Sequence, residues 1–444
     1  MIEFKNIEYQ KEYKELAQFF LDDGDYVFIK NGDSLEFFAD NYNDKILIAD
    51  VIEAEKSNIK IAIFKLLERY TKKTLPWGIL VGVNPLKKFR KIINQYEDTS
   101  REILSEKYLI DNSKIDLGMH VIKTQSALVG TIKGKTSIYV DIPFCTTRCA
   151  YCAYPTYRLD DDLIADYLKA LEREISETLD ELKLDLASIY IGGGTPSAIG
   201  WKNLDRVLKM LERFSDKEIE YTVEIGRPDS IDKNILDALK YYAVDRISIN
   251  PQTMSDATLK SIGRGHSVED IKRAFFDARR LGFNNINMDL IMELPGESAD
   301  DFKKSLIEIS ALEPESITIH ALSLKKSSEL TLDGMDSSFG GEFSKVRDEF
   351  LNVSDYKPYY LYRQKNINPY LENVGYTKPG FESLYNIAMM EDLNHIIGFG
   401  LGATTKFLVD NGLKKNMNHR NIRDYIEKID EDIKNKRNLM EEIY

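Results

Sequence analysis

The three cysteines of this 444-residue chain all lie within one stretch of eight residues. They are Cys145, Cys149 and Cys152, and the chain has no further cysteine with which they could build a disulfide framework. Thiolates are the usual protein ligands of iron–sulfur clusters, so three of them on one loop can hold three irons of a [4Fe–4S] cluster. The fourth iron then accepts a ligand other than cysteine, which is a property of catalytic rather than structural metal sites.

Zinc is the alternative metal for these thiolates. A zinc site with three cysteines needs a fourth ligand, and the chain has only five histidines. The histidine nearest in sequence is His120, which does not lie at the spacing of a zinc finger. The spacing therefore favours the iron–sulfur cluster over zinc.

Composition limits the class of protein. A hydrophobic fraction of 43% with evenly spread charges is typical of a globular protein, and the length predicts two or three domains. No segment reaches the ~18 uncharged apolar residues of a membrane span, and the N-terminus lacks the plan of a signal peptide. We therefore predict a cytoplasmic protein. The net charge of −13 argues against nucleic-acid binding but leaves an anionic substrate open.

Residues 1–130 differ in character from the rest of the chain. Short alternating runs at 26–30, 45–49 and 60–64 predict strands or a switch from strand to helix. A polar stretch at 87–107 has helical character. We predict an N-terminal accessory α+β domain here, with no visible chemistry.

Residues 131–330 alternate between short apolar runs and longer amphipathic segments. The apolar runs cover residues 137–142, 186–191, 219–224, 245–250, 285–291 and 316–320. The first segment between them, 163–182, has leucine and isoleucine at helical spacing. Six strands that alternate with helices predict an α/β fold, a partial (β/α)6 barrel around a parallel sheet.

Polar or glycine-rich features recur where these predicted strands end. The cysteine loop follows the first strand and the glycine run 192–194 follows the second. The remaining features are Glu224, Asn250 to Gln252, Asp289 and His320. The active site of a (β/α) barrel lies at the C-terminal ends of its strands, so we predict one site built from six loops. Glu224 and Asp289 lie in apolar context, where a buried carboxylate needs an arginine or a ligand as its partner.

Residues 331–444 are predicted to form a C-terminal α+β extension on the substrate side. The run 356–366 combines tyrosines with bases, and it predicts either a sheet edge or a flat apolar wall suited to a planar polyanion. Under the second interpretation, Arg363 and Lys365 are candidate substrate contacts. Residues 421–442 alternate in charge at helical spacing and predict a solvated helix.

Several motifs match one family in their order along the chain. They are Tyr139-Val-Asp-Ile-Pro-Phe-Cys, Gly192-Gly-Gly-Thr-Pro-Ser, Val223-Glu224-Ile, Arg246-Ile-Ser-Ile-Asn-Pro-Gln252, Ile262-Gly-Arg264 and Asp289-Leu-Ile-Met-Glu-Leu-Pro295. With the cysteine spacing, they resemble the radical S-adenosylmethionine (SAM) superfamily, and within it the oxygen-independent coproporphyrinogen III oxidase family. The N-terminal extension, the Tyr-Arg-Gln-Lys-Asn run and Glu372-Asn-Val-Gly-Tyr resemble its HemZ-type coproporphyrinogen dehydrogenase branch.

The resemblance implies which residues hold the cofactors. The three cysteines would bind the [4Fe–4S] cluster, and the SAM on that cluster would contact Tyr139, Tyr151, Gly193 and Glu224. Five further residues match contacts of a second SAM in the best-known branch: Gly194, Thr195, Gln252, Arg264 and Asp289. That branch has histidine at the position of Asp141 and another cysteine just after the third. The five residues are therefore predicted to serve a second SAM, the first SAM or the substrate.

The reaction that the resemblance implies is an oxidative decarboxylation. Cleavage of SAM by the reduced cluster would give a 5′-deoxyadenosyl radical, which takes a hydrogen atom from the β-carbon of a propionate. Two propionates of coproporphyrinogen III would become vinyl groups, giving protoporphyrinogen IX in anaerobic haem biosynthesis. The implied partners are this tetrapyrrole, with Arg363, Lys365 and Lys406 as candidate cations, and an electron donor such as flavodoxin or ferredoxin. We expect a monomer.

Two other functions stay open from the sequence. The haem-chaperone branch has a His-Asn motif where this chain has Tyr385 and Asn386, and a chaperone would hold SAM without turning it over. The second alternative is another radical SAM reaction on a tetrapyrrole, such as anaerobic haem degradation. Cleavage of SAM separates the chaperone from both enzymes, and the mass of the product separates the two enzymes from each other.

Overall fold

A computed structural model gives the structure of the chain, and it describes residues 1–52, 54–179, 182–214, 218–323, 340–364, 367–410 and 412–443. These residues form two compact units. Unit 1 comprises Met1–Ile122 and Leu361–Glu372, and unit 2 comprises Lys123–Tyr360 and Asn373–Tyr444. The three-domain scheme with boundaries near 130 and 330 stays a prediction. The contacts add one feature to it, because residues 361–372 of the C-terminal section pack with the N-terminal unit.

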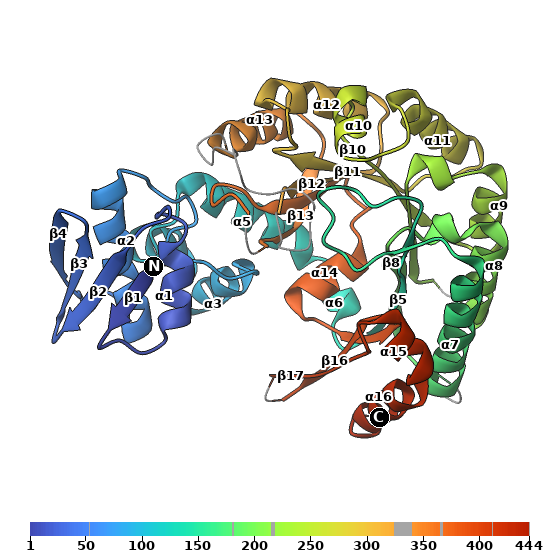
Figure 1. Cartoon of the computed structure of the whole chain (residues 1–444), viewed down its shortest axis with the longest axis horizontal. Coiled ribbons are helices and arrows are strands. Elements are labelled where there is room, and N and C mark those ends of the chain that lie inside the picture. The colour runs from blue at the N-terminus through green and yellow to red at the C-terminus, as the bar shows by residue number, and fades with distance from the viewer. Residues whose placement is uncertain are drawn as a thin grey trace. The chain divides into compact units, whose positions relative to one another are not determined.

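Unit 1 is built on a four-stranded sheet in the order β1-β2-β3-β4 (blue in Figure 1). Its helices and strands are β1 (Ile2–Lys5), α1 (Gln10–Ala17), β2 (Tyr26–Asn31), β3 (Ser34–Ala39), β4 (Tyr42–Leu47), α2 (Glu55–Thr71), α3 (Leu86–Tyr96), α4 (Ser100–Glu102) and most of α5 (Asn112–Ser126). The run 60–64, for which a strand was one of two predictions, lies inside helix α2. Ile59, Ile63 and Leu66 are buried at helical spacing, which explains why the segment folds as a helix.

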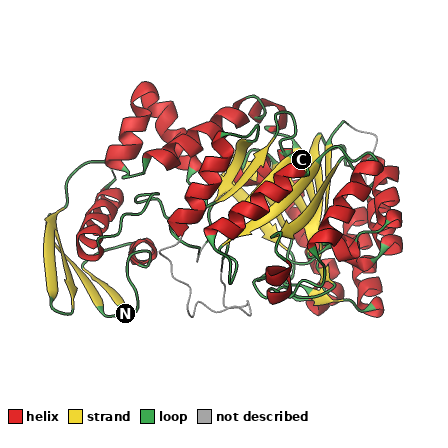
Figure 2. Cartoon of the chain, turned by 90° about the horizontal axis from the view of Figure 1, so that it is seen from above, coloured by secondary structure: helices red, strands yellow, loops and turns green. Residues whose placement is uncertain are grey.

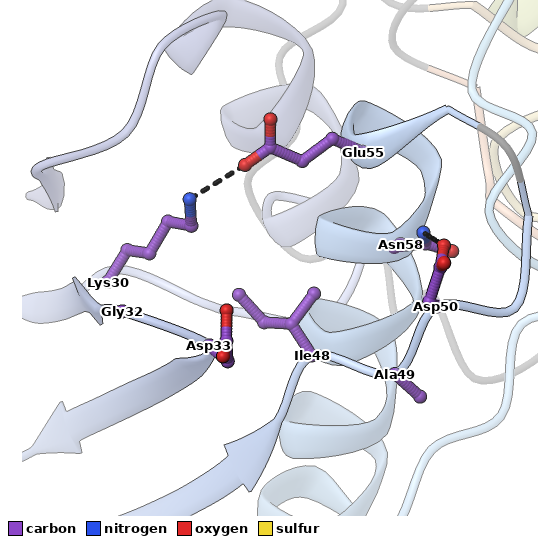
Figure 3. A pocket seen from close by; sticks show the side chains of 8 residues that line it. All are labelled: Lys30, Gly32, Asp33, Ile48, Ala49, Asp50, Glu55 and Asn58. Atoms are coloured by element: carbon purple, nitrogen blue, oxygen red, sulfur yellow. Dashed lines mark hydrogen bonds and ion pairs between the residues drawn. The ribbon is translucent and has the colours of Figure 1, made fainter.

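A cavity of about 270 Å³ opens in unit 1 beside the start of helix α2 (Figure 3). Lys30 Nζ pairs with Glu55 Oε1 at 2.7 Å across it, and Asn58 Nδ2 donates to Asp50 Oδ1 at 3.2 Å. Two of the charged groups that line the cavity, Lys30 and Glu55, therefore pair with each other. No residue predicted to bind cluster, SAM or substrate lines it.

Unit 2 contains an eleven-stranded sheet in the order β13-β14-β12-β11-β10-β9-β8-β5-β15-β16-β17. Its first strands are β5 (Thr136–Ile142), β8 (Leu186–Gly193), β9 (Glu220–Gly226), β10 (Arg246–Gln252), β11 (Ile286–Met292) and β12 (Ser316–Ala321). These six strands pair in parallel, each with its neighbour, and they match the six predicted strands. The sheet ends in β13 and β17 among the described strands, so it forms a partial rather than a closed barrel.

Helices cover the outer side of this curved sheet, as Figures 1 and 2 show. They are α7 (Asp161–Leu179), α8 (Trp201–Met210), α9 (Lys233–Tyr241), α11 (Val268–Arg280) and α12 (Ala299–Ala311). Helices α11 and α12 begin at capping boxes, in which Ser267 pairs with Asp270 and Ser298 pairs with Asp301. No helix in the described ranges is long and apolar enough to cross a membrane.

The C-terminal section adds strands at both ends of the sheet. Its elements are α13 (Gly340–Asn352), β13 (Lys357–Tyr362), β14 (Asn373–Thr377), α14 (Leu384–Glu391), β15 (His395–Phe399), β16 (Thr404–Val409), β17 (Gly412–Met417), α15 (Ile422–Glu427) and α16 (Ile429–Glu441). Strand β13 is an edge strand, so the tyrosine-rich run matches the sheet-edge interpretation. The predicted terminal helix is present as two helices, α15 and α16.

A buried ion pair fixes helix α16 to helix α7. Glu174 and Lys436 have fully buried side chains and form a salt bridge. Glu174 also accepts hydrogen bonds from Tyr425 Oη at 2.7 Å, Asn418 Nδ2 at 2.7 Å and Gly400 N at 2.9 Å. The C-terminal helices therefore hold the turn at residues 400–401 in place.

That turn supports the end of strand β5, where the cysteine loop begins. Tyr167 Oη donates to the Asp141 carbonyl oxygen at 2.7 Å and accepts from Leu401 N at 3.1 Å. The tyrosine hydroxyl thus links the backbone of β5 to the turn that the Glu174 network holds. Stability of the C-terminal helices is in this way coupled to the position of Asp141.

Breaking the buried pair should destabilise the protein strongly. Lys436→Met leaves the Glu174 carboxylate buried without its cation, so we expect a loss of roughly 3–5 kcal/mol in the free energy of unfolding. The matched control is Arg173→Gln, because Arg173 on α7 pairs with Asp430 on α16 through exposed side chains. That exposed pair should contribute at most about 1 kcal/mol. Urea denaturation of both variants measures the difference, and equal losses would contradict the ranking.

Candidate active site

The cysteine segment leaves the sheet at the C-terminal end of β5. Its first residues form a two-stranded ladder between β6 (Phe144–Cys145) and β7 (Tyr157–Arg158). Cys149 is buried, whereas Cys145 and Cys152 are partly exposed. Cys152 N donates to the Cys149 carbonyl at 2.9 Å, so the last two cysteines lie on one tight turn. Three thiols with this mixture of burial and access suit a cluster that must also reach a ligand.

The glycine run after β8 packs its backbone directly against the cysteine segment. Gly194 N donates to the Ile142 carbonyl at 2.9 Å, and Thr195 N donates to the Phe144 carbonyl at 2.8 Å. A β-carbon on Gly194 would lie 2.6 Å from the Phe144 carbonyl oxygen. The absence of side chains is therefore needed for the two backbones to meet. Thr195 Oγ1 then reaches Cys145 Sγ at 3.4 Å.

Gly193 must also be glycine, for reasons of backbone conformation and space. Its φ of +110° is strained for any residue with a side chain, and a β-carbon there would lie 2.2 Å from Asp141 Oδ1. Gly193 thus lets the Asp141 carboxylate approach the strand end. Asp141 accepts hydrogen bonds from Tyr154 Oη at 2.6 Å and Tyr139 Oη at 3.3 Å, while its Oδ2 is buried with no partner in the protein.

Each of the six parallel strands has one polar side chain that is partly exposed, while its other residues, apart from Gly193 on β8, are buried. These residues, which we call the polar ring, are Tyr139, Tyr190, Glu224, Asn250, Asp289 and His320. Register and contacts join them on one face of the sheet. Tyr139 lies opposite Tyr190, whose hydroxyl donates to Glu224, and Asp289 Oδ2 lies 3.5 Å from His320 Nε2. The predicted site at the strand ends is therefore one continuous polar surface.

Hydrogen bonds connect the ring between β10 and β11. Asn287 Nδ2 donates to Asp289 Oδ1 at 2.7 Å and to Ser248 Oγ at 2.7 Å. Ser248 Oγ in turn donates to Asn250 Oδ1 at 2.6 Å. These contacts fix the Asp289 carboxylate, leaving its second oxygen for His320.

Burial perturbs the acids of this surface. Desolvation raises the pKa of Glu224 to about 7, with a further contribution from the charge of Asp289. Desolvation likewise raises the pKa of Asp141 to about 7. Burial opposes the protonation of His320, but the hydrogen bond and charge of Asp289 hold its pKa above the ordinary value. Perturbed acids in one polar surface are typical of a functional site.

Three tyrosine rings stack beside these acids. The Tyr190 and Tyr385 ring centroids are 4.4 Å apart at an interplanar angle of 23°, and Tyr139 stacks at 6.1 Å from Tyr385. Tyr385 lies on α14, at the position where the haem-chaperone branch has its histidine. The stack gives the site an apolar wall next to its charged groups.

The remaining predicted cofactor residues lie around the loops after β10. Gln252 ends β10 with a φ of +70°, and its side-chain Oε1 is buried without a protein partner. Arg264 donates from Nη1 to the Asn250 carbonyl, and its Nε is likewise buried without a partner. Tyr151 packs against a buried apolar group formed by Ile262, Ile291, Leu294 and Leu322.

These observations fit the implied cofactors. Buried polar atoms in proteins are nearly always hydrogen-bonded, so Asp141 Oδ2, Gln252 Oε1 and Arg264 Nε are places where a bound molecule would supply the partner. Cys145, Cys149 and Cys152 would supply the thiolates for a cluster. Glu224 offers a desolvated carboxylate that a cationic group, such as the amino group of SAM, would stabilise.

Two of the cations predicted to meet the substrate, Arg363 and Lys406, are buried and held by other protein groups. Arg363 lies in unit 1 with 3% of its surface exposed, and its Nη1 donates to the Leu80 carbonyl at 2.7 Å. Its guanidinium also lies over the rings of Phe19 and Trp77, an arrangement that favours a packing role. Lys406 is buried and pairs with Asp392 at 2.6 Å. Lys365 lies outside the described residues.

Comparison with known proteins identifies the family. Residues 139–309 match the family model of the radical SAM superfamily. The chain is 41% identical to the oxygen-independent coproporphyrinogen-III oxidase-like protein HemZ of Bacillus subtilis over 391 aligned residues. The alignment covers 84% of this chain and 77% of that protein. The chain belongs to the HemZ-type family of the radical SAM superfamily. Proteins of this superfamily use a [4Fe–4S] cluster and SAM, so the cofactor prediction is confirmed and zinc is set aside.

Two further relatives place this HemZ-type chain among its neighbours. The heme chaperone HemW of Bacillus subtilis is 35% identical over 190 residues, which is 42% of this chain and 50% of that protein. The solved coproporphyrinogen III oxidase HemN of Escherichia coli matches with a TM-score of 0.53 and 20% identity, over 69% of this chain and 72% of that one. The structural match supports the fold alone.

Sequence reasoning missed two residues of this surface. Tyr190 and Tyr385 carry the aromatic stack, yet neither was a candidate for the site. Strand alternation could have found Tyr190, because it lies two residues before Gly192 and hence on the same face of β8. The match of Tyr385 to the haem-chaperone motif marks the residue but does not place it beside Tyr190, because that contact depends on how α14 packs against β8.

Replacing Gly193 should impair cluster assembly. Gly193→Ala places a methyl group against Asp141 and forces a strained backbone, so we expect the iron and sulfide content after anaerobic reconstitution to fall well below that of the native protein. The matched control is Gly130→Ala, where the added β-carbon meets nothing within 4 Å. Native-like cluster content in the Gly193 variant would show that the close packing is dispensable.

Affinity for SAM should depend on pH through Glu224. If the ionised carboxylate holds the SAM amino group, protonation near the pKa of about 7 removes the attraction, so binding weakens as the pH falls. Below pH 7 we expect about a tenfold rise in Kd per pH unit. Glu224→Gln should bind SAM weakly with a flatter profile, which also separates its contribution from that of Asp141. Calorimetric titration of cluster-loaded protein measures both, and an unchanged slope in the variant would contradict the role.

Proposed function

We propose that this protein is an oxygen-independent coproporphyrinogen III oxidase, a coproporphyrinogen dehydrogenase that converts propionates into vinyl groups. The observation that carries the proposal is the HemZ relative, whose similarity extends over most of both chains. The reaction removes carbon dioxide, one hydrogen atom and one electron from each propionate side chain. When bound, the cluster and SAM supply the radical that takes the hydrogen atom.

The described residues have definite tasks in this proposal. Cys145, Cys149 and Cys152 hold the cluster, and Glu224 with the Gly193 backbone orients SAM on it. The stacked rings of Tyr190 and Tyr385 offer an apolar surface to a planar substrate. Asp141 and its two tyrosines close the side next to the cysteine loop. Asp141 and Tyr385 are buried, and a site with such a lining would limit the access of water to the reacting carbon.

We further propose that His320 binds a propionate of the substrate. It is the only member of the polar ring whose side chain can carry a positive charge, and 26% of that side chain is exposed. Asp289 keeps the imidazole protonated more readily than usual, although burial opposes this. His320 also pairs with Asp289, but its side chain is partly exposed, whereas Arg363 and Lys406 are buried and therefore poorer candidates.

A haem-binding chaperone is the second candidate function. Several relatives carry the name heme chaperone HemW, and one of them shares 35% identity with this chain. The position of the branch's histidine is occupied by Tyr385, which stacks on Tyr190. A chaperone predicts tight haem binding without cleavage of SAM, whereas the oxidase predicts cleavage coupled to substrate.

Anaerobic incubation of the reconstituted protein with SAM, a reductant and coproporphyrinogen III tests the proposal. We expect a product lighter by one carbon dioxide and two hydrogen atoms for each propionate converted, as read by mass spectrometry. Cleavage of SAM with no change in the tetrapyrrole would point to another radical reaction, and haem binding without cleavage would support the chaperone. Either result overturns the proposal that the protein is a coproporphyrinogen III oxidase.

His320→Gln tests the substrate contact in the same assay. Loss of a hydrogen bond to a charged group costs about 1.5–3 kcal/mol, so decarboxylation should fall by about ten- to a hundredfold. Cleavage of SAM without substrate should persist, because the cysteines and Glu224 are unchanged. Arg363→Ala serves as the comparison variant. A larger specific loss of decarboxylation in that variant would restore Arg363 as the substrate contact.

A further inference from the structure

A buried arginine, Arg227, contacts the cysteine loop at Thr147 and Cys149. Arg227 follows strand β9 and has 2% of its surface exposed. Its Nε and Nη2 donate to Asp229 Oδ1 and Oδ2, each at 3.0 Å. Its third nitrogen, Nη1, donates to Thr147 Oγ1 at 2.8 Å and lies 3.8 Å from Cys149 Sγ. One edge of the guanidinium therefore binds the Asp229 carboxylate, and Nη1 on the other side faces the Cys149 thiol.

The carboxylate side of this contact is held from several directions. His266 Nδ1 lies 3.2 Å from Asp229 Oδ1, and Thr146 Oγ1 donates to Asp229 Oδ2 at 3.1 Å. Burial opposes ionisation of Asp229, but the hydrogen bonds from His266 and Arg227 bring its pKa below the usual range. Asp229 is thus an anion that orients Arg227 and partly offsets its charge.

The loop itself is fixed against this group. Thr147 Oγ1 donates to the Gly263 carbonyl at 3.1 Å, and Ala150 N donates to the Ile262 carbonyl at 3.0 Å. Arg264 also interacts with Cys149, but that residue is one of the predicted cofactor contacts. Arg227 is buried as well, but it is not among the residues predicted to contact a cofactor. Its task therefore concerns the thiolate rather than a ligand.

We propose that Arg227 is a positioning residue that raises the reduction potential of the cluster held by Cys149. Hydrogen bonds to the ligating sulfurs and nearby charge are established determinants of such potentials. In the step concerned, a low-potential donor loses one electron and the cluster site gains it, and no covalent bond or proton changes. Arg227 stabilises the added negative charge because Nη1 presents a donor and a positive charge at Cys149 Sγ. The inference holds for any substrate, since it concerns electron entry alone.

Redox titration of the reconstituted protein without SAM, followed by electron paramagnetic resonance, tests this role. Arg227→Gln should lower the ratio of reduced to oxidised cluster about tenfold at a fixed potential, equivalent to a midpoint about 59 mV lower. Arg227→Lys keeps the charge and should shift the ratio less. Arg206→Gln is the control, because Arg206 lies on α8 and pairs with Glu172 through exposed side chains. Its midpoint should equal that of the native protein.

Asp229→Asn supplies a test of opposite sign. Removing the anion leaves the charge of Arg227 uncompensated, so the midpoint should rise instead of falling. A purely structural role predicts loss of cluster, or equal midpoints, in both variants. If the Arg227 variants fail to hold iron, the asparagine variant decides, and a midpoint at or below the native value overturns the proposal. An unchanged midpoint in Arg227→Gln with full iron content overturns it as well.

Discussion

The close contact between the glycine run and the cysteine segment determines the geometry of the whole site. Gly194 and Thr195 donate backbone hydrogen bonds to the segment between β5 and Cys145, and this is possible because residues 193 and 194 have no side chains. The same contact brings Asp141 against Gly193 and Thr195 against Cys145. Cluster ligands, glycine loop and acid are thus positioned by one backbone interaction rather than by separate side chains.

The buried charges of this surface determine which ligand it favours. The surface gathers Asp141, Glu224 and Asp289 in buried surroundings, and burial alone makes the ionised forms of the first two unfavourable. A cationic ligand relieves that cost, because it restores a charge partner to a desolvated carboxylate. SAM carries both an ammonium and a sulfonium group, so the site is complementary to it. His320 behaves in the opposite way: burial disfavours its charged form, but Asp289 favours the charged imidazole and raises the pKa of His320.

Much of this arrangement was accessible from the sequence, because parallel strands obey simple rules. All six strands of the barrel were predicted, and the features at their ends meet on one surface because the strands run in the same direction. Helix α2 was harder to predict, because a short apolar run such as residues 61–64 suits a buried strand and a buried helix alike. The burial of Ile59, Ile63 and Leu66, which are at helical spacing, settles the choice.

Other parts could not be predicted, because they depend on contacts between distant segments. Arg363 looked like a substrate cation beside tyrosines, yet its guanidinium is held by the Leu80 carbonyl and two aromatic rings from the first ninety residues. The stack of Tyr190 and Tyr385 joins residues almost two hundred positions apart. Arg227 is an exposed-looking residue in the sequence, and only the fold reveals that one edge of it faces Cys149.

The separation of these groups has a consequence for how the family can vary. Arg227 and the glycine loop contact the cysteine segment, whereas Tyr385 and His320 belong to helix α14 and to strand β12, the sixth strand of the barrel. Substitutions in the second group alter the aromatic wall and the charge of the polar ring, and they need not disturb the backbone contact at residues 193–195. A scaffold built this way can keep its SAM chemistry while the surface offered to a ligand changes. Relatives with oxidase-like and chaperone names are compatible with this division, since the difference between them need not involve the cysteine loop.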